Sequence, residues 1–221
     1  MTHIITIDGP SGSGKGTIAA RVAGRLGWRL LDSGAIYRVL GLVVERAGVD
    51  VREVEKLCEL ANGMQLSFEQ GRVMLDGEDV SSMIRTESAG NAASKVASVP
   101  EVRSALLEWQ HNYAQPPGLV ADGRDMGTVV FPQAEVKIFL TASAEERAQR
   151  RYKQLKDKGL NVSLADLAAE IRERDERDRN RSVAPLIPAA SAVEVDSTQM
   201  SIDEVTELVL REAGKAFPRL I

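Results

Sequence analysis

The fold is decided by Gly9-Pro10-Ser11-Gly12-Ser13-Gly14-Lys15-Gly16-Thr17, a glycine-rich stretch near the start of the chain. Before it, Ile4–Asp8 is a β-branched apolar run of the kind that forms a buried strand. After it, Ile18, Val22 and Leu26 recur at helical spacing. A strand, a glycine loop and a helix in this order predict a P-loop, whose backbone N–H groups and helix N-terminus face the phosphates of a nucleoside triphosphate.

Lys15 ends the glycine loop and is predicted to bring a mobile positive charge to the β- and γ-phosphates. The usual pattern has Ser or Thr directly after this Lys, but here Gly16 comes before Thr17. The ending resembles that of the nucleoside monophosphate kinases, in which the Thr hydroxyl lies near the phosphates and magnesium. Thr17 is therefore a candidate magnesium ligand. An ordinary glycine-rich turn between strand and helix is the alternative.

Composition indicates a globular protein of the cytoplasm. The chain has 221 residues, 43% hydrophobic and 27% charged, enough for one α/β domain with an inserted subdomain. Its net charge is 28 − 32 = −4, which predicts no nucleic-acid partner. No apolar run approaches a membrane span, and the first strand leaves no room for a signal peptide. The single cysteine, Cys58, fits a reducing compartment. We expect a monomer, since no exposed apolar stripe is evident.

Five short apolar runs alternate with helical patterns. This order predicts an α/β fold of the P-loop NTPase type, with a doubly wound five-stranded parallel sheet whose ligands lie at the carboxyl ends of the strands. Between residues 65 and 80, Gln70-Gly71 and Asp76-Gly77 separate short alternating runs, which predicts an inserted antiparallel meander. The expected strands are 4–8, 29–32, 119–122, 136–140 and 192–196.

Several helix ends carry recognisable signals. Ser33 is expected to cap a helix that runs on from Ile36 and stops at Gly48. Capping boxes are expected at Ser143 and Ser201, each followed three residues later by Glu. Further helices are expected over 51–61, 87–97 and 100–113, and a long charged helix is expected from Ser163.

Two stretches that follow strands have more polar groups than a core needs. In 32–38, Arg38 lies in the first turns of a helix, where a cation is mildly unfavourable unless a phosphate is bound there. In 122–128, Asp122 has a place suited to the second shell of a magnesium ion, and Arg124 and Asp125 are predicted to point into the cleft. A plain surface loop with a salt bridge is the alternative for 122–128.

The third stretch is the charge run 172–181. By itself such a run is usually a solvated helix face. However, Arg174, Arg177 and Arg181 fall at i, i+3 and i+7, with Asp178 beside them. Three guanidinium groups on one helical stripe repel one another unless anions lie opposite, and phosphoryl transfer supplies such anions.

With these stretches assembled, the chain resembles the bacterial cytidylate kinases over essentially its whole length. The resemblance implies one kinase core, 1–221, with a monophosphate-binding insertion at about 60–95 and a short arginine-rich lid at about 155–182. It also implies transfer of the γ-phosphoryl group of ATP, with Mg²⁺, to CMP or dCMP in pyrimidine metabolism. The matching motifs are Gly9–Thr17, Leu31–Arg38, Asn91–Ser94, Ala121–Thr128 and Arg174–Pro185.

The resemblance also assigns residues. The expected catalytic residues are Lys15, Arg124, Arg174 and Arg177. The expected acceptor-binding residues are Arg38 and Arg124 for the phosphate, Ser94, Arg103 and Asp125 for cytosine, Asp178 and Arg181 for the ribose and base side, with Ser33 and Tyr37 nearby.

Two other functions stay open from the sequence. A regulatory ATPase or GTPase would hydrolyse slowly and bind a partner protein, and a guanine-reading Asn-Lys-x-Asp motif is absent from the sequence. A kinase for another small acceptor, such as UMP or shikimate, is the nearer alternative.

Overall fold

The computed structural model describes residues 2–69, 71–157 and 159–218. It divides into two compact units. Unit 1 contains the chain up to Leu31 and from Ala114 onward, and unit 2 contains Asp32–Tyr113. The predicted insertion at about 60–95 falls within unit 2 and the predicted lid at about 155–182 within unit 1. Their roles as a monophosphate-binding subdomain and a lid stay predictions.

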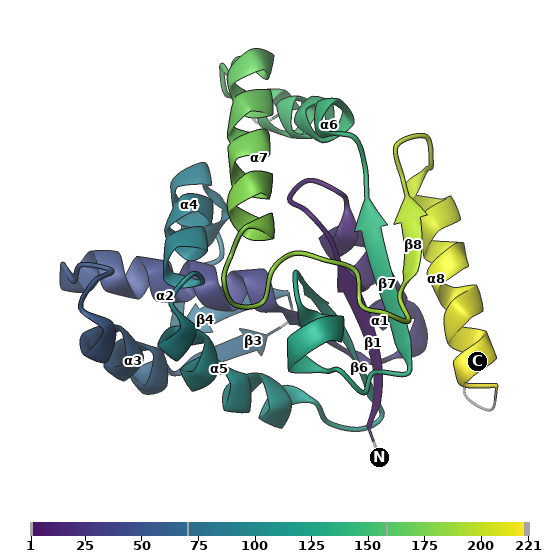
Figure 1. Ribbon diagram of the computed structural model, residues 1–221, viewed down its shortest axis with the longest axis horizontal. Coiled ribbons are helices and arrows are strands. Elements are labelled where there is room, and N and C mark those ends of the chain that lie inside the picture. The colour runs from purple at the N-terminus through teal and green to yellow at the C-terminus, as the bar shows by residue number, and fades with distance from the viewer. Residues whose placement is uncertain (1, 70, 158, 219–221) are drawn as a thin grey trace. The chain divides into compact units, whose positions relative to one another are not determined.

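Unit 1 is built on a parallel sheet. Its described strands have the order β2-β6-β1-β7-β8, and β1 pairs in parallel with both β6 and β7. Figure 1 shows β7 between β1 and β8. The predicted five-stranded sheet is therefore confirmed. The elements are β1 (His3–Asp8), α1 (Lys15–Leu26), β2 (Arg29–Asp32), β6 (Gly118–Gly123), a π-helical turn (Met126–Val130), β7 (Val136–Thr141), α6 (Ala144–Asp157), α7 (Leu164–Arg179), β8 (Val193–Asp196) and α8 (Ile202–Ala216).

The apolar faces of α1 and α8 form one core with the central strands. Ile5 and Ile7 of β1 are fully buried because parallel strands are covered on both faces. Pairing places Asp8, the last residue of β1, beside Gly123 of β6 and Phe139 of β7. Polar residues at these strand ends therefore gather at one edge of the sheet, where the P-loop begins.

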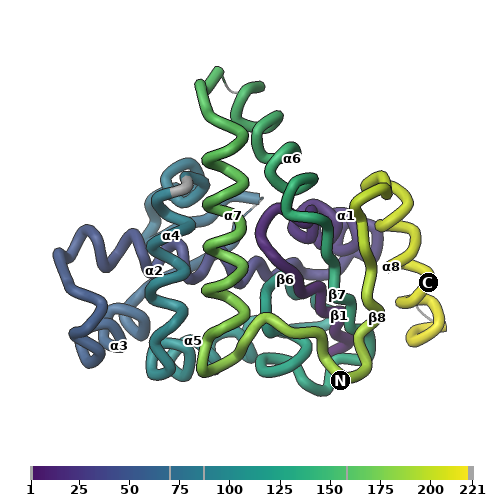
Figure 2. Tube along the Cα trace, turned by 45° about the horizontal axis from the view of Figure 1, so that its top comes forward, coloured from purple at the N-terminus to yellow at the C-terminus, as the bar shows by residue number. Residues whose placement is uncertain are grey.

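Helices α6 and α7 lie side by side in both views (Figures 1 and 2). The Ser143 hydroxyl accepts the Glu146 N–H at 3.1 Å, as predicted for the start of α6. The other half of the prediction, a hydrogen bond from the Ser143 N–H to the Glu146 carboxylate, is wrong. The Ser143 N–H donates to Thr198 Oγ1, and the Glu146 carboxylate accepts from Arg150. The predicted box at Ser201 is complete and begins α8.

Unit 2 contains the predicted antiparallel meander, in the order β3-β4-β5. The β4–β5 hairpin turns at Asp76 and Gly77, with φ angles of 49° and 85°, as the Asp-Gly signal predicts. Gln70, in the other predicted turn, lies outside the described residues. The elements are α2 (Ser33–Ala47), α3 (Val54–Gly63), β3 (Leu66–Glu69), β4 (Arg72–Leu75), β5 (Glu78–Asp79), a 3₁₀ turn (Met83–Arg85), α4 (Glu87–Val96) and α5 (Pro100–Tyr113).

Two predicted helix starts in unit 2 are wrong. Helix α2 begins at Ser33 because the Asp32 carboxylate, not the Ser33 hydroxyl, accepts the Ala35 N–H at 3.0 Å. Helix α3 begins at Val54, not at residue 51, because Asp50 accepts hydrogen bonds from both the backbone and the side chain of Arg52. Such local bonds compete with helix formation. The predicted stop of α2 at Gly48, with φ of 64°, is confirmed.

None of the helices in the described ranges combines the length and the apolar composition needed to cross a lipid bilayer.

Candidate active site

The P-loop connects β1 directly to α1, as predicted. A Cβ atom at Gly9 would lie 2.0 Å from the carbonyl oxygen of Leu140, so only glycine allows the loop to pass this close to β7. Gly14 caps α1 with φ of 91°, in the left-handed region that favours glycine. Within the described chain, the buried Ser13 hydroxyl has no hydrogen-bond partner. The loop is thus a tight, preformed turn at the carboxyl edge of the sheet.

Lys15 is buried beside the carboxylate of Asp122. Its Nζ donates to the carbonyl oxygen of Pro10 at 3.3 Å and lies 3.9 Å from Asp122 Oδ1. A Cβ atom at Gly16 would lie 3.0 Å from Asp122 Oδ2. A side chain at position 16 would therefore press against the Asp122 carboxylate, which is consistent with glycine where other P-loops have Ser or Thr.

Asp122 and Thr17 both carry side-chain oxygen atoms, and oxygen is the ligand that magnesium favours. Asp122 is the buried carboxylate near the end of β6, and Thr17 lies exposed in the first turn of α1. Magnesium is usually held by one or two carboxylates together with substrate phosphates and water. The two side chains therefore suit a Mg²⁺ ion that arrives with a nucleotide.

Asp8 is a site residue that the sequence reasoning missed. Its two carboxylate oxygens accept the backbone N–H groups of Met126 and Gly127, each at 2.8 Å. Burial raises the pKa of Asp8 to about 6, although these two hydrogen bonds oppose the rise. Asp8 therefore ties the turn that follows Arg124 and Asp125 to the end of β1.

Arg124 and Asp178, both predicted to bind the acceptor, contact each other. Arg124 Nε donates to Asp178 Oδ2 at 3.0 Å, and both side chains are largely buried. Burial alone would raise the pKa of Asp178, but the guanidinium groups of Arg124, Arg181 and Arg174 outweigh it and hold that pKa below its ordinary value. Asp178 is consequently ionised and positions Arg124.

The three arginines predicted to share one face of α7 have different surroundings. Arg174 Nη1 lies 3.4 Å from the Ser11 hydroxyl, so one predicted catalytic cation does reach the P-loop. Arg177 pairs with Glu173 at 3.4 Å. The expectation that Arg181 shares their helical face is wrong, because α7 ends at Arg179; Arg181 instead donates to the carbonyl oxygen of Asp178 at 3.3 Å.

A sequence signal for the buried carboxylates of α7 was available. The buried residues of this helix, Leu167, Ile171, Asp175 and Asp178, form one stripe at helical spacing. Two aspartates that continue an apolar stripe indicate buried charges that need cationic partners. For Asp8, the signal was an acidic residue ending an otherwise apolar strand.

Of the remaining predicted acceptor residues, Asp125 is buried in unit 1 directly after Arg124, and the others lie in unit 2. Ser33, Tyr37, Ser94 and Arg103 are buried there. The guanidinium of Arg103 lies 5.5 Å from the centre of the Tyr37 ring, a cation–π contact that joins α5 to α2. Arg38 Nη1 donates to the carbonyl oxygens of Ile84 and Thr86, at 2.7 and 3.2 Å. Arg38 is thus held beside the start of α4.

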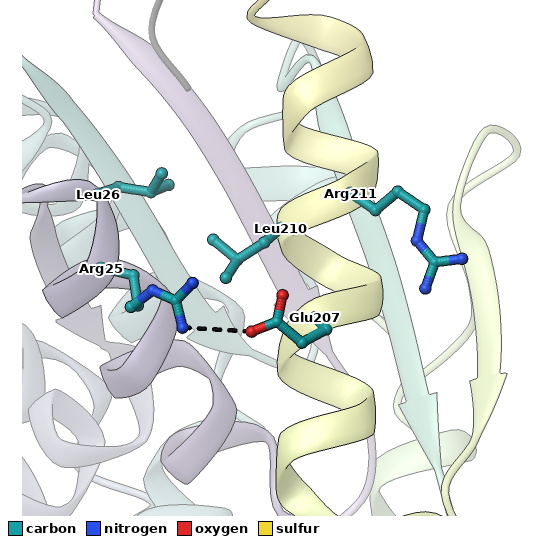
Figure 3. A pocket seen from close by; sticks show the side chains of 5 residues that line it. All are labelled: Arg25, Leu26, Glu207, Leu210 and Arg211. Carbon is teal, nitrogen blue, oxygen red and sulfur yellow. Dashed lines mark hydrogen bonds and ion pairs between the residues drawn. The ribbon is translucent and has the colours of Figure 1, made fainter.

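Unit 1 also has a surface hollow, whose lining side chains are drawn in Figure 3. It is lined by Leu26 and Leu210, by the ion pair of Arg25 with Glu207, and by Arg211. The P-loop lies at the first residue of α1 and the hollow at its last turn, about 15 Å of helix apart. It is therefore separate from the predicted phosphate site.

Comparison with known proteins decides the family. The family model described as cytidylate kinase matches residues 5–215. The chain belongs to the cytidylate kinase family. A cytidylate kinase from Aeromonas hydrophila is 61% identical over 217 residues, covering 96% of this chain and 94% of that protein. A cytidylate kinase from Marinomonas sp. is 55% identical over 218 residues, covering 96% of each.

A solved structure supports the fold of this cytidylate kinase family member. The structure of a sugar kinase from Janibacter sp. HTCC2649 matches with a TM-score of 0.50 at 18% identity, and covers 100% of this chain and 98% of that one. At this identity the likeness concerns the fold alone.

Proposed function

We propose that the chain transfers the γ-phosphoryl group of ATP to CMP or dCMP, giving ADP and CDP or dCDP. The observation that carries the proposal is the approach of Arg174 to the P-loop, 3.4 Å from the Ser11 hydroxyl. Phosphoryl transfer requires positive charge on more than one side of the transferring group, and Lys15 with Arg174 supplies it from α1 and α7. Family membership supports CMP as the acceptor.

The proposed chemistry needs no general base. An acceptor phosphate oxygen is already anionic, so catalysis consists of positioning and of stabilising charge. Lys15, Arg124, Arg174 and Arg177 are proposed to do this. Within the described residues, the buried Nε of Arg177 has no hydrogen-bond acceptor, which suits a group that binds an anion.

The proposed acceptor contacts divide by chemistry. Arg38 and Arg124 bind the phosphate, because guanidinium groups match phosphate oxygens in pairs. Ser94, Arg103 and Asp125 read the base, and Asp125 accepts a hydrogen bond from the exocyclic amine of cytosine. The others bind the ribose and base side: Ser33, Tyr37, Asp178 and Arg181.

The proposal includes Mg²⁺, which would lie against the nucleotide phosphates near Asp122 and Thr17 and offset their charge. It also includes a monomer that acts in the cytoplasm. Size-exclusion chromatography with light scattering, with and without nucleotides, tests the monomer.

A coupled ADP-release assay tests the function as a whole. The enzyme is given ATP and Mg²⁺ with CMP, dCMP, UMP, AMP or water alone. We expect fast turnover with CMP and dCMP and slow release with water. Equal rates with all acceptors and water would indicate a regulatory NTPase, and a preference for UMP would move the assignment to another acceptor.

A further inference from the structure

Arg147 of α6 is a buried cation to which neither the sequence nor the proposed function assigns a role. Its exposed fraction is 3%. Nε donates to the carbonyl oxygen of Ala142 at 2.9 Å, and Nη1 donates to that of Ser11 at 2.9 Å. The two Nη atoms also form a bidentate pair with the Asp175 carboxylate of α7. One guanidinium thus joins the end of β7, the P-loop and α7.

The P-loop also packs on the backbone of Arg147. A Cβ atom at Gly12 would lie 3.1 Å from Arg147 Cβ and 3.5 Å from the Arg147 carbonyl oxygen. The turn of the loop therefore rests against α6, and its position depends on where α6 begins.

These contacts determine the direction of the P-loop peptides. In a planar trans peptide, the carbonyl oxygen of one residue and the N–H of the next point in opposite directions. Because Arg147 holds the Ser11 carbonyl, the Gly12 N–H points away from α6. Arg150, one turn later on α6, donates to the Ser13 carbonyl at 3.3 Å, so the Gly14 N–H also points away.

The same guanidinium reaches the helix that carries a proposed catalytic residue. Asp175 lies within α7 and directly follows Arg174, whose Nη1 lies 3.4 Å from the Ser11 hydroxyl. The side chains of Arg147 and Asp175 are 3% and 10% exposed. A buried bidentate pair of this kind has one geometry, so it restricts how α7 can lie against the P-loop.

We propose that Arg147 is a positioning residue for phosphoryl transfer. It orients the Ser11–Gly12 peptide for phosphate binding and, through Asp175, holds α7 so that Arg174 lies at the P-loop. The proposal rests on the proposed function only in taking ATP as the ligand of the P-loop.

The test compares Arg147→Gln, Asp175→Asn and the double variant with the wild-type enzyme. Arg147→Gln alone leaves a buried carboxylate without its cation, which by itself threatens folding. The double variant places an amide beside an amide and removes that charge. Arg172→Gln is the matched control, because Arg172 pairs with Glu145 at 2.7 Å between the same two helices, but both side chains are exposed.

Three kinds of measurement are made: calorimetry gives the affinity for a non-hydrolysable ATP analogue, steady-state kinetics gives kcat and both KM values, and thermal unfolding gives the melting temperature. A misplacement of about 1 Å in a reacting group can cost about a hundredfold in rate. We therefore expect the double variant to lose at least about tenfold in analogue affinity and about a hundredfold in kcat. The KM for CMP should stay within about threefold, and Arg172→Gln should stay within about twofold of wild type in every quantity.

The two single variants show whether the residues act as a unit. Asp175→Asn should lower kcat with a smaller effect on analogue affinity, because the Ser11 contact stays. The double variant should be no worse than Arg147→Gln, since groups that act together are not additive. If Arg147→Gln does not fold, the double variant and Arg147→Lys decide the question; Lys should recover part of kcat and lack the bidentate pair.

The proposal is overturned if the double variant binds the analogue and turns over within about threefold of wild type, whatever its melting temperature. It is also overturned if only the melting temperature falls. Failure of the proposed function would appear elsewhere, as a wild-type enzyme that does not phosphorylate CMP, while the analogue titrations would still decide the role of Arg147.

Discussion

At the scale of single residues, the P-loop edge of unit 1 is a set of buried cations beside carboxylates. Lys15 lies near Asp122, and Arg124 pairs with Asp178. Removing one partner of a buried pair leaves the other charge desolvated, which is costly. Substitutions here therefore need readouts that separate chemistry from stability.

Lys15→Ala should nearly abolish phosphoryl transfer. Removing a preorganised cation from the developing charge should cost about 3 kcal/mol or more, about a hundredfold in kcat. Steady-state kinetics measures this, with Lys215→Ala as the control because the Lys215 side chain is exposed on α8, where it pairs with Glu212 at 2.6 Å. If Lys15→Ala retained turnover within a factor of a few, that result would contradict the P-loop assignment.

Asp125→Ala should narrow the preference for CMP over UMP. Uracil presents a carbonyl where cytosine presents an amine, so it would face the Asp125 carboxylate acceptor to acceptor. Buried polar mismatches of this kind discriminate by several kcal/mol. Arg38→Ala should weaken CMP and UMP alike, because it is proposed to bind phosphate. An unchanged CMP-to-UMP ratio of kcat/KM in Asp125→Ala would place the amine reader elsewhere.

Asp8 should titrate near pH 6. Its pKa is raised from 3.8 to about 6 in the folded protein. The folded state therefore holds this proton more tightly than the unfolded chain. The stability it contributes is fully present below pH 3.8 and is lost as the pH rises through about 6. A carboxyl ¹³C titration should show a midpoint near 6 that is absent in Asp8→Asn. A midpoint near 4 would contradict the assignment.

At the scale of elements, backbone spacing is set by glycines as much as by apolar side chains. At the start of β6, a Cβ atom at Gly118 would lie 2.3–2.6 Å from three ring atoms of Trp28. The strand can take its place in the sheet only because position 118 has no side chain. At Gly24 of α1, by contrast, nothing lies within 4 Å of an added Cβ.

Two glycine substitutions should therefore have opposite effects on stability. Gly118→Ala overpacks the site and should lower the free energy of unfolding by about 1–3 kcal/mol. Gly24→Ala lies in a helix interior and should raise it by about 0.5–1 kcal/mol, because alanine restricts the unfolded chain and favours helix. Urea denaturation measures both. Equal effects of the two substitutions would contradict the role of the Trp28 contact.

At the scale of the whole molecule, substrates are expected to order segments that are far apart in sequence. The segments at about 60–95 and about 155–182 are proposed to close over bound nucleotides and exclude water. Hydrogen exchange with CMP and an ATP analogue together should show increased protection in both, more than with either nucleotide alone. Unchanged protection in both segments at saturation would show that closure does not occur.

The sequence by itself determined the strand–loop–helix of the P-loop, the five parallel strands, the meander and most helix ends. These features depend on short-range periodicity, on glycine and on capping residues, which act within a few positions of one another. The Gly48 stop and the Ser201 capping box are examples. The prediction at Ser33 failed because the neighbouring Asp32 caps the helix instead. The prediction at Val51 failed because Asp50 holds Arg52 in local hydrogen bonds that compete with the helix.

Only the tertiary structure decided which partners the buried charged side chains have. Asp8 and Met126 are far apart in sequence, as are Arg147 and Ser11, and no periodicity relates them. The order of the strands puts the first pair together, and the packing of α6 on α7 brings Arg147 to Asp175 and the P-loop. Partners of buried charges depend on which elements become neighbours, because desolvation makes those contacts necessary only after the chain has folded.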